Sequence, residues 1–168
     1  MTMRIVQADA KDVDQVAEIL HEAACWLEQS GMPMWRDDEL RAAHVAADVQ
    51  AGVFFLAEHD GAPVGVVKFQ LEDPRFWPDV PVGHSAFIHR LAVRRQFAGG
   101  TVSSALLRWA VDRARSLGRR HLRLDCEAAR PRLRAVYERF GFQHHSDRQV
   151  GPYFVARYEY DVTAHQKG

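Results

Sequence analysis

The stretch that decides the fold is SAFIHRLAVRRQFAGGTVSSALL, residues 85–107. Its first half is rich in β-branched and aromatic residues and predicts a strand. The glycine-bearing loop Ala98-Gly99-Gly100 follows, and an amphipathic helical pattern begins after it. A strand joined to a helix in this way leaves backbone N–H groups unpaired at the positive end of the helix dipole, where phosphate oxygens bind. The stretch therefore indicates a phosphate-bearing ligand, although glycines at such a connection also serve as plain turn residues.

The length and charge of the chain limit the classes of protein it can belong to. Its 168 residues are enough for one domain that buries about 70% of its unfolded surface. With 22 basic and 22 acidic side chains the formal charge is zero, so we expect neither a nucleic-acid partner nor a polybasic membrane surface. Arginines concentrate between Arg90 and Arg139, which indicates either an anionic ligand or a solvated basic face.

The cysteines and the N-terminus bear on metals and on location. Cys25 and Cys126 lie far apart and lack metal-ligand spacing, so we expect reduced core thiols and no metal site. The sequence MTMRIVQAD has no apolar signal region, and no segment approaches 18 apolar residues. These features predict a cytoplasmic protein without a membrane partner.

Periodicity outside the central stretch predicts the remaining elements. Asp12 and Gln15 form a capping-box pattern ahead of the first helix. The order indicates an α/β (α+β) fold, one domain over 1–162 with a mixed sheet of about seven strands and about four helices, and a frayed tail over 163–168. The strands are expected at 4–8, 53–58, 63–71, 87–93, 121–126, 142–148 and 153–161, and the helices from 12, 37–49, 102–117 and 131–140.

Two loops carry large aromatic residues, and those of the second loop are a pair of the buried type. The loop after the first helix contains Trp35, and the unusually long loop 72–83 contains Phe76 and Trp77. Long loops in compact domains are often functional. The aromatic side chains either join neighbouring elements or form the apolar walls of an acceptor pocket.

Two segments, LAVRRQFAGGTVSSALL and LRLDCEAARPRLRAVYERFGF, resemble the GNAT superfamily of N-acetyltransferases, and the likeness extends over essentially the whole chain. The family loop pattern Q/R-x-x-G-x-G/A falls on residues 98–103. The closing pattern Y-x-x-x-G-F falls on Tyr137, Gly141 and Phe142. The resemblance implies a single GNAT-like domain with a mostly antiparallel mixed sheet and acetyl-coenzyme A (acetyl-CoA) as the acyl donor.

The resemblance also implies where the donor binds. Backbone amides of the loop would hold the pyrophosphate, and backbone groups of Leu91 and Val93 would hold the pantetheine arm and polarise the thioester carbonyl. The cofactor-binding residues expected on this basis are Leu91, Ala92, Val93, Arg94, Ala98, Gly99, Gly100, Thr101, Val102, Ser103 and Ser104.

Acetyl transfer to an amine also needs a general acid and a general base. The resemblance places the hydroxyl of Tyr137 near the departing thiolate, so we expect this phenol to be the acid. His89 and Glu127 are candidate bases, and Glu72 and Asp73 are carboxylates where relatives often carry a base or bind a cationic acceptor.

Two further side chains on the 121–126 strand have structural interpretations. Asp125 reads as a buried, hydrogen-bonded carboxylate. Cys126 is expected to be a core thiol, because no partner lies at a diagnostic spacing for a nucleophile. We therefore expect direct transfer without an acyl-enzyme.

The leading hypothesis is an N-acetyltransferase that acts on a primary amine of a small molecule in a ternary complex. Trp35, Glu72, Phe76 and Trp77 would bind this acceptor, and the C-terminal strands would suit a homodimer. The alternative is a non-catalytic acyl-CoA-binding or sensing module. It is motivated by Ala98, Thr101 and Ser103, which stand where the family has a cationic or amide side chain and two glycines.

Overall fold

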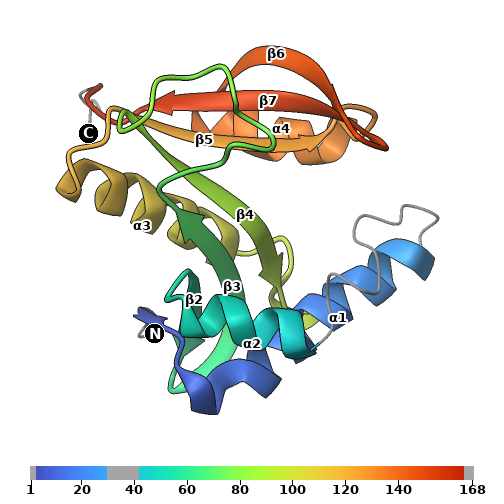
Figure 1. Cartoon of the computed structure of the whole chain (residues 1–168). Coiled ribbons are helices and arrows are strands. Elements are labelled where there is room, and N and C mark those ends of the chain that lie inside the picture. Colours follow the sequence, from blue (N-terminus) through green and yellow to red (C-terminus); the bar gives the residue numbers. More distant parts are fainter. Residues whose placement is uncertain (1–2, 30–41, 165–168) are drawn as a thin grey trace. The chain divides into compact units, whose positions relative to one another are not determined.

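The computed structural model describes residues 3–29 and 42–164 (Figure 1). Strands and helices follow one another there in the order that the sequence predicts. The strands are β1 (Met3–Gln7), β2 (Phe54–His59), β3 (Ala62–Gln70), β4 (Ser85–Val93), β5 (His121–Glu127), β6 (Gln143–Val150) and β7 (Tyr153–Asp161). The α-helices of this part of the chain are α1 (Val13–Gln29), α2 (Ala42–Gln50), α3 (Val102–Ser116) and α4 (Pro131–Phe140).

The seven strands form one mixed sheet in the order β1-β2-β3-β4-β5-β7-β6. Strands β4 and β5 pair in parallel, whereas β1 with β2, β2 with β3, β5 with β7 and β6 with β7 pair antiparallel. The predicted α/β class with a mixed sheet of seven strands and four helices is confirmed.

The chain divides into two compact units, which are described separately. The first consists of Met1–Phe69 with Arg90–Leu107, and the second of Gln70–His89 with Arg108–Gly168. Strand β4 changes unit between His89 and Arg90, and helix α3 between Leu107 and Arg108.

In the first unit, α1 and α2 bury their apolar faces against the strands. Residues of α1 that recur at helical spacing form one side of this core, which explains why an amphipathic pattern was visible in the sequence. Gly65 on β3 has a packing role, because an added Cβ would lie 3.0 Å from Val102 Cγ1 and 3.2 Å from the carbonyl oxygen of Ala92. The buried cluster comprises Ala8, Val16, Ile19, Leu20, Val45, Val49, Phe54, Leu56, Val66 and Ala92.

In the second unit, α4 lies on one face of β5 and β7 (Figure 1). The ring of Tyr137 on α4 is 6.4 Å from that of Tyr158 on β7 and 6.0 Å from that of Phe142, centroid to centroid. Gly141 ends α4 with a φ of 125°, a backbone angle that favours glycine. The closing Y-x-x-x-G-F pattern is thus the end of a helix and its packing onto the sheet.

The expected capping box at Asp12 and Gln15 was wrong. A 3₁₀ turn, η1 (Ala10–Asp12), precedes α1, and Asp9 is the residue that caps it. The Asp9 carboxylate accepts the N–H of Lys11 at 3.0 Å, and the Asp12 carboxylate accepts the N–H of Asp9 at 3.0 Å. The box therefore lies three residues earlier, because the extra turn satisfies the first backbone donors.

Three earlier expectations fall partly or wholly on parts of the chain that are not described. The start of the predicted helix 37–49, Trp35 and most of the tail 163–168 lie outside residues 3–29 and 42–164. Within those described ranges, no helix has the length and apolar character needed to cross a membrane.

Candidate functional site

The loop ahead of α3 belongs to the first unit and has the local geometry of an anion site. After the 3₁₀ turn η3 (Arg95–Phe97), Gly99 adopts a φ of 80°, which favours glycine. The N–H of Ala105 makes the first bond of the helix, to the carbonyl of Thr101 at 3.0 Å. The N–H groups of the preceding helical residues, 102–104, then have no carbonyl partner within the helix. The first turn of α3, which is fully described, carries no acidic side chain, so nothing in it opposes a bound anion.

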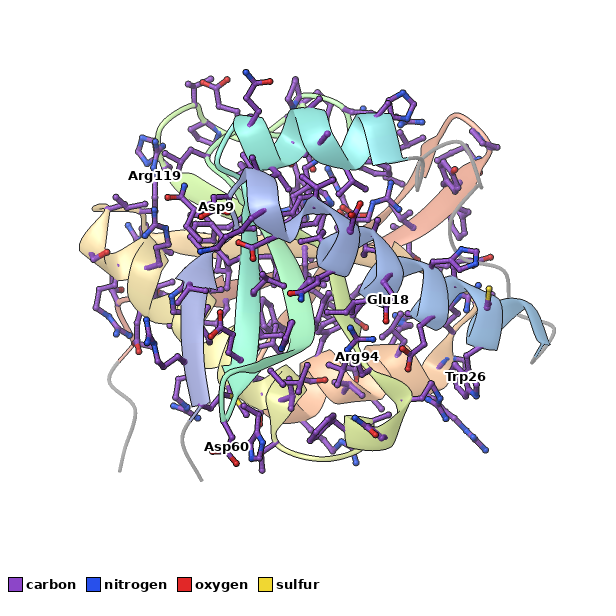
Figure 2. The ribbon with its side chains drawn as sticks, turned by 90° about the horizontal axis from the view of Figure 1, so that it is seen from below. Asp9, Glu18, Trp26, Asp60, Arg94 and Arg119 are labelled. Atoms are coloured by element: carbon purple, nitrogen blue, oxygen red, sulfur yellow. The ribbon has the colours of Figure 1, made fainter. Side chains whose placement is uncertain are left out.

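The turn before this loop is attached to α1 through two glutamates. Arg94 Nη1 lies 2.9 Å from Glu18 Oε1 and 3.2 Å from Glu22 Oε2, and Figure 2 shows Glu18 and Arg94 facing one another. Glu22 also accepts the backbone N–H of Arg95 at 2.8 Å. The Arg95 guanidinium lies 3.8 Å from the ring centroid of Trp26. Arg94, expected among the cofactor-binding residues, is therefore already neutralised by α1.

Arg90, the first residue of strand β4 that belongs to the first unit, has an irregular backbone angle. Arg90 has a φ of 55°, in the left-handed region, although it is not glycine. Ala92 is buried, whereas Leu91 and Val93 on either side of it are half-buried. Leu91 and Val93 thus share a face that is not fully closed by the core.

In the second unit, His89 lies between two carboxylates. Its Nε2 is 2.9 Å from Oδ2 of Asp73, and its Nδ1 is 4.0 Å from Oδ2 of Asp125. The exposed fractions of the three side chains are 19% for His89, 6% for Asp73 and 10% for Asp125. Their ligand-type atoms lie within 4.8 Å of one another, so the same three residues offer donor atoms suited to a metal ion.

Asp73 remains ionised in this setting. Burial pushes the pKa of its carboxyl upward, but the hydrogen bond and charge of His89 and the backbone N–H groups of Phe76 and Arg75 outweigh burial, so the pKa is lowered. The N–H of Phe76 donates to Oδ1 of Asp73 at 3.1 Å. His89 therefore faces a carboxylate that is both charged and fixed in place.

Tyr137 and Cys126 both hold their protons firmly. Tyr137 is 7% exposed, and burial followed by the charges of Cys126 and Asp125 raises the pKa of its phenol. Burial likewise raises the pKa of the Cys126 thiol to about 12. Cys126 is thus a poor nucleophile at neutral pH, because the thiolate is the reactive form.

The other two candidate carboxylates, Glu127 and Glu72, are more exposed to solvent than the residues of this cluster. Glu127 accepts a 2.8 Å hydrogen bond from the guanidinium of the buried Arg130, and it is 48% exposed. Glu72 is exposed to solvent at the end of β3. A carboxylate already paired with a cation is a weaker candidate for a base than a histidine between two carboxylates.

The aromatic residues of the 72–83 loop differ in position. The Phe76 ring lies 6.1 Å from that of His89, as a wall beside that histidine. Trp77 was expected to bind the acceptor, but it is only 2% exposed. The guanidinium carbons of Arg123 and Arg157 lie 4.9 Å and 4.5 Å from its ring centroid. These contacts make Trp77 a core residue with no ring face to offer to a ligand.

The comparison with known protein families decides the identity of the chain. The profile of the acetyltransferase (GNAT) family matches residues 16–142, which include the loop, His89 and Tyr137. The chain belongs to the GNAT acetyltransferase family. GNAT proteins are acetyl-CoA-dependent acetyltransferases, so the predicted enzyme class is confirmed.

Individual GNAT proteins resemble the chain along most of its length. An uncharacterised N-acetyltransferase of Bacillus subtilis, YesJ, is 26% identical over 141 residues, covering 79% of this chain and 77% of its own. A GNAT-family acetyltransferase structure from Listeria monocytogenes superimposes with a TM-score of 0.79 at 21% identity, over 95% of this chain and 94% of that one. The PaiA N-acetyltransferase of Thermoplasma acidophilum, solved with coenzyme A, gives a TM-score of 0.73 at 15% identity, over 95% and 100% of the two chains. These two structures support the GNAT fold.

Sequence reasoning did not bring out the Asp73–His89–Asp125 cluster of this GNAT protein. Each residue was noticed alone, but nothing in the sequence joined a loop residue to two different strands. The structure brings two of the three together through the β4–β5 register: Phe87 pairs with Arg123 at the end of the ladder, and His89 and Asp125 each follow two residues later.

Proposed function

We propose that the protein transfers the acetyl group of acetyl-CoA to a primary amine of a small molecule by direct attack in a ternary complex. The position of His89 between Asp73 and Asp125 is the observation that supports an amine as the acceptor. A histidine can take a proton from an ammonium group near neutral pH, and neighbouring carboxylates stabilise the imidazolium that forms. Phe76 would supply an apolar wall for the acceptor beside this base.

The donor is proposed to bind through the loop ahead of α3. The pyrophosphate would accept hydrogen bonds from backbone N–H groups of Gly99 and residues 101–104, with the helix dipole adding to the attraction. The hydroxyls of Thr101 and Ser103 are further donors. Backbone groups of Leu91 and Val93 would hold the pantetheine arm and stabilise the oxyanion that develops on the thioester carbonyl.

Tyr137 is proposed as the general acid. The amine nitrogen attacks the thioester carbon, the carbon–sulfur bond breaks, and the thiolate leaves with the electron pair. Tyr137 is protonated at neutral pH, because burial raises its pKa. It would pass its proton to that thiolate and recover the second proton that the attacking nitrogen loses, so that no tyrosinate accumulates. Cys126 takes no part, because its thiol is held protonated.

The test is a thiol-release assay with acetyl-CoA and a panel of primary amines, with the acetylated product identified by mass spectrometry. We expect turnover that falls about 100-fold or more in Tyr137→Phe, while the Kd for acetyl-CoA stays unchanged. Asp112→Asn, on the exposed face of α3, serves as the control. Undiminished turnover in Tyr137→Phe would remove this residue from the mechanism.

A second candidate function is a non-catalytic acyl-CoA-binding or sensing module. Arg94 favours it, because its guanidinium is neutralised by Glu18 and Glu22 and does not replace the cation missing at Ala98. Binding of acetyl-CoA without turnover of any amine in the panel would select this candidate over the enzyme.

We also propose a cytoplasmic homodimer formed along the β6 edge. Strand β6 is the last strand of the sheet, and an unpaired edge can pair with a second copy. Light scattering of the full chain would show twice the monomer mass, whereas a monomer at all concentrations would exclude the dimer.

A further inference from the structure

Arg75 is an exposed arginine without a carboxylate beside it. It lies in the 72–83 loop of the second unit, which contacts β5 and β7 (Figure 1). Within residues 3–29 and 42–164, no carboxylate lies at ion-pair distance from its guanidinium. Arg157 of β7 differs, because Asp79 contacts it at 2.7 Å and 3.0 Å. The guanidinium of Arg75 is thus open to an anionic ligand.

Two aromatic rings orient this guanidinium. Its central carbon lies 5.3 Å from the ring centroid of Phe76 and 5.8 Å from that of Tyr153, the first residue of β7. The Nη2 atom also approaches the β6–β7 turn, where a Cβ added to Gly151 would lie 4.0 Å from it. Stacking uses the flat faces of a guanidinium and leaves the N–H groups at its edge for hydrogen bonds.

The backbone around Arg75 is held by three hydrogen bonds. The N–H of Phe76 donates to Oδ1 of Asp73 at 3.1 Å, and the N–H of Trp77 donates to the carbonyl oxygen of Asp73 at 3.0 Å. Nη1 of Arg157 donates to the carbonyl oxygen of Phe76 at 3.1 Å. A side chain on a fixed turn loses less entropy when it binds a ligand than one on a mobile segment. These contacts therefore preorganise Arg75 for binding.

Phe76 connects Arg75 with the proposed acceptor site. Its ring contacts the Arg75 guanidinium and lies 6.1 Å from the ring of His89. An acceptor that reaches both His89 and Arg75 would lay a carbon chain against this ring. The planar fork of an arginine matches the two oxygens of a carboxylate and can form two parallel hydrogen bonds with them.

We propose that Arg75 binds a carboxylate of the acceptor, and that the substrate class is an aminocarboxylate, a primary amine joined to a carboxylate by a short carbon chain. This rests on the proposed function, because the ligand of Arg75 is the acceptor of the acetyl group. Arg75 determines specificity and takes no part in the chemistry. It lowers the KM for acceptors that carry the carboxylate and leaves the kinetics of uncharged analogues unchanged.

Acids and their amides differ in charge but hardly in size, so they test the role of Arg75 directly. The full chain is titrated calorimetrically, with and without coenzyme A, with β-alanine, γ-aminobutyrate and δ-aminovalerate, each beside its amide. We expect at least one acid to bind about tenfold more tightly than its amide, a difference between that of an exposed ion pair and that of a hydrogen bond between charged groups. Equal Kd values for every acid and its amide would overturn the proposal.

Variants of Arg75 assign the preference to this residue. Arg75→Gln should abolish it and keep the Kd of each amide within about twofold, because an uncharged amide gains little from a nearby cation. Arg75→Lys keeps the charge without the planar fork and should retain only part of the preference. Arg139→Gln, which alters an exposed arginine of α4, is the matched control. A preference for the acid that survives Arg75→Gln would refute the assignment.

Two further measurements separate this inference from its competitors. Tighter binding of O-phosphoethanolamine than of any of the acids would replace the carboxylate with a phosphate. Thiol release from acetyl-CoA is measured with the same acids and amides. Turnover without a preference for acids refutes this inference alone, whereas Arg75-dependent binding of an acid without acetylation of any acceptor refutes the proposed function alone.

Discussion

The carboxylate of Glu22 on α1 accepts the backbone N–H of Arg95 at 2.8 Å. The same side chain contacts the Arg94 guanidinium, so one residue of α1 fixes both the backbone and a side chain of the turn that precedes the α3 loop. A loop held in its binding conformation loses less entropy when a ligand binds. If the loop binds the donor as proposed, α1 contributes to that binding by holding the preceding turn in place.

The first prediction concerns this attachment. Glu22→Gln keeps the shape of the side chain but weakens both contacts, and we expect the Kd for acetyl-CoA to rise about fivefold, as for a loss of about 1 kcal/mol. Isothermal titration calorimetry measures it. Glu18→Gln is the matched control, because Glu18 contacts Arg94 but not the Arg95 backbone. Equal effects of the two variants would show that the Arg95 contact has no separate role.

The second prediction concerns acid stability. Asp79 makes a two-point contact with the buried Arg157, at 2.7 Å and 3.0 Å. The hydrogen bond from Arg157 is the main cause that lowers the pKa of Asp79 from 3.8 to about 2. A folded-state pKa below the unfolded value means that the stabilisation is complete above about pH 4 and is lost as the pH falls toward 2.

Asp79→Asn should therefore lower the free energy of unfolding near neutral pH by about 1 kcal/mol, a small value because water screens the half-exposed carboxylate. The difference between the two proteins should shrink as the pH falls from 4 to 2. Thermal unfolding at a series of pH values measures this. A difference that stays constant over that range would refute the ionic origin of the effect.

The third prediction separates a core role from a binding role for Trp77. We expect Trp77→Ala to cost about 3–5 kcal/mol of stability, as for other large aromatic residues removed from a core. Trp77→Phe should lose less stability and leave the KM for the acceptor unchanged. Urea unfolding and steady-state kinetics provide the two readouts. A raised KM with normal stability would restore Trp77 to the acceptor site.

The fourth prediction addresses covalent catalysis. Cys126→Ala should keep kcat within about twofold, because a thiol with a pKa of about 12 contributes almost no thiolate at pH 7. Steady-state kinetics and mass spectrometry of the protein during turnover measure this. An acetylated Cys126 together with inactivity of the variant would establish an acyl-enzyme instead.

Much of the fold could be predicted from the sequence because the elements carry strong local signals. Apolar periodicity marks α1 and α3, and Asp60-Gly61 marks the β2–β3 turn, where both residues have positive φ. The start of α1 was predicted correctly, but its capping box was placed three residues late, because Asp9 and Asp12 both suit a cap and only the structure shows the intervening 3₁₀ turn.

The candidate site could be predicted less well, since it depends on contacts between distant segments. Strand alternation shows which face His89 occupies but not that Asp73, from a loop, reaches its Nε2. Trp77 illustrates the reverse error: a loop tryptophan suggested a binding role, but Arg123 and Arg157, remote in sequence, enclose it. The left-handed φ of Arg90 could not be predicted, because an arginine gives no indication of such a backbone angle.

The central claim is that the loop before α3 holds the donor, and calorimetric titration with acetyl-CoA tests it most directly. The unaltered protein should bind, and Gly100→Glu should weaken binding by at least about 100-fold, because a carboxylate beside the pyrophosphate costs several kcal/mol. Gln143→Glu, which adds the same charge on exposed β6, should bind normally. Failure of the unaltered protein to bind, or normal binding by Gly100→Glu, would contradict the account.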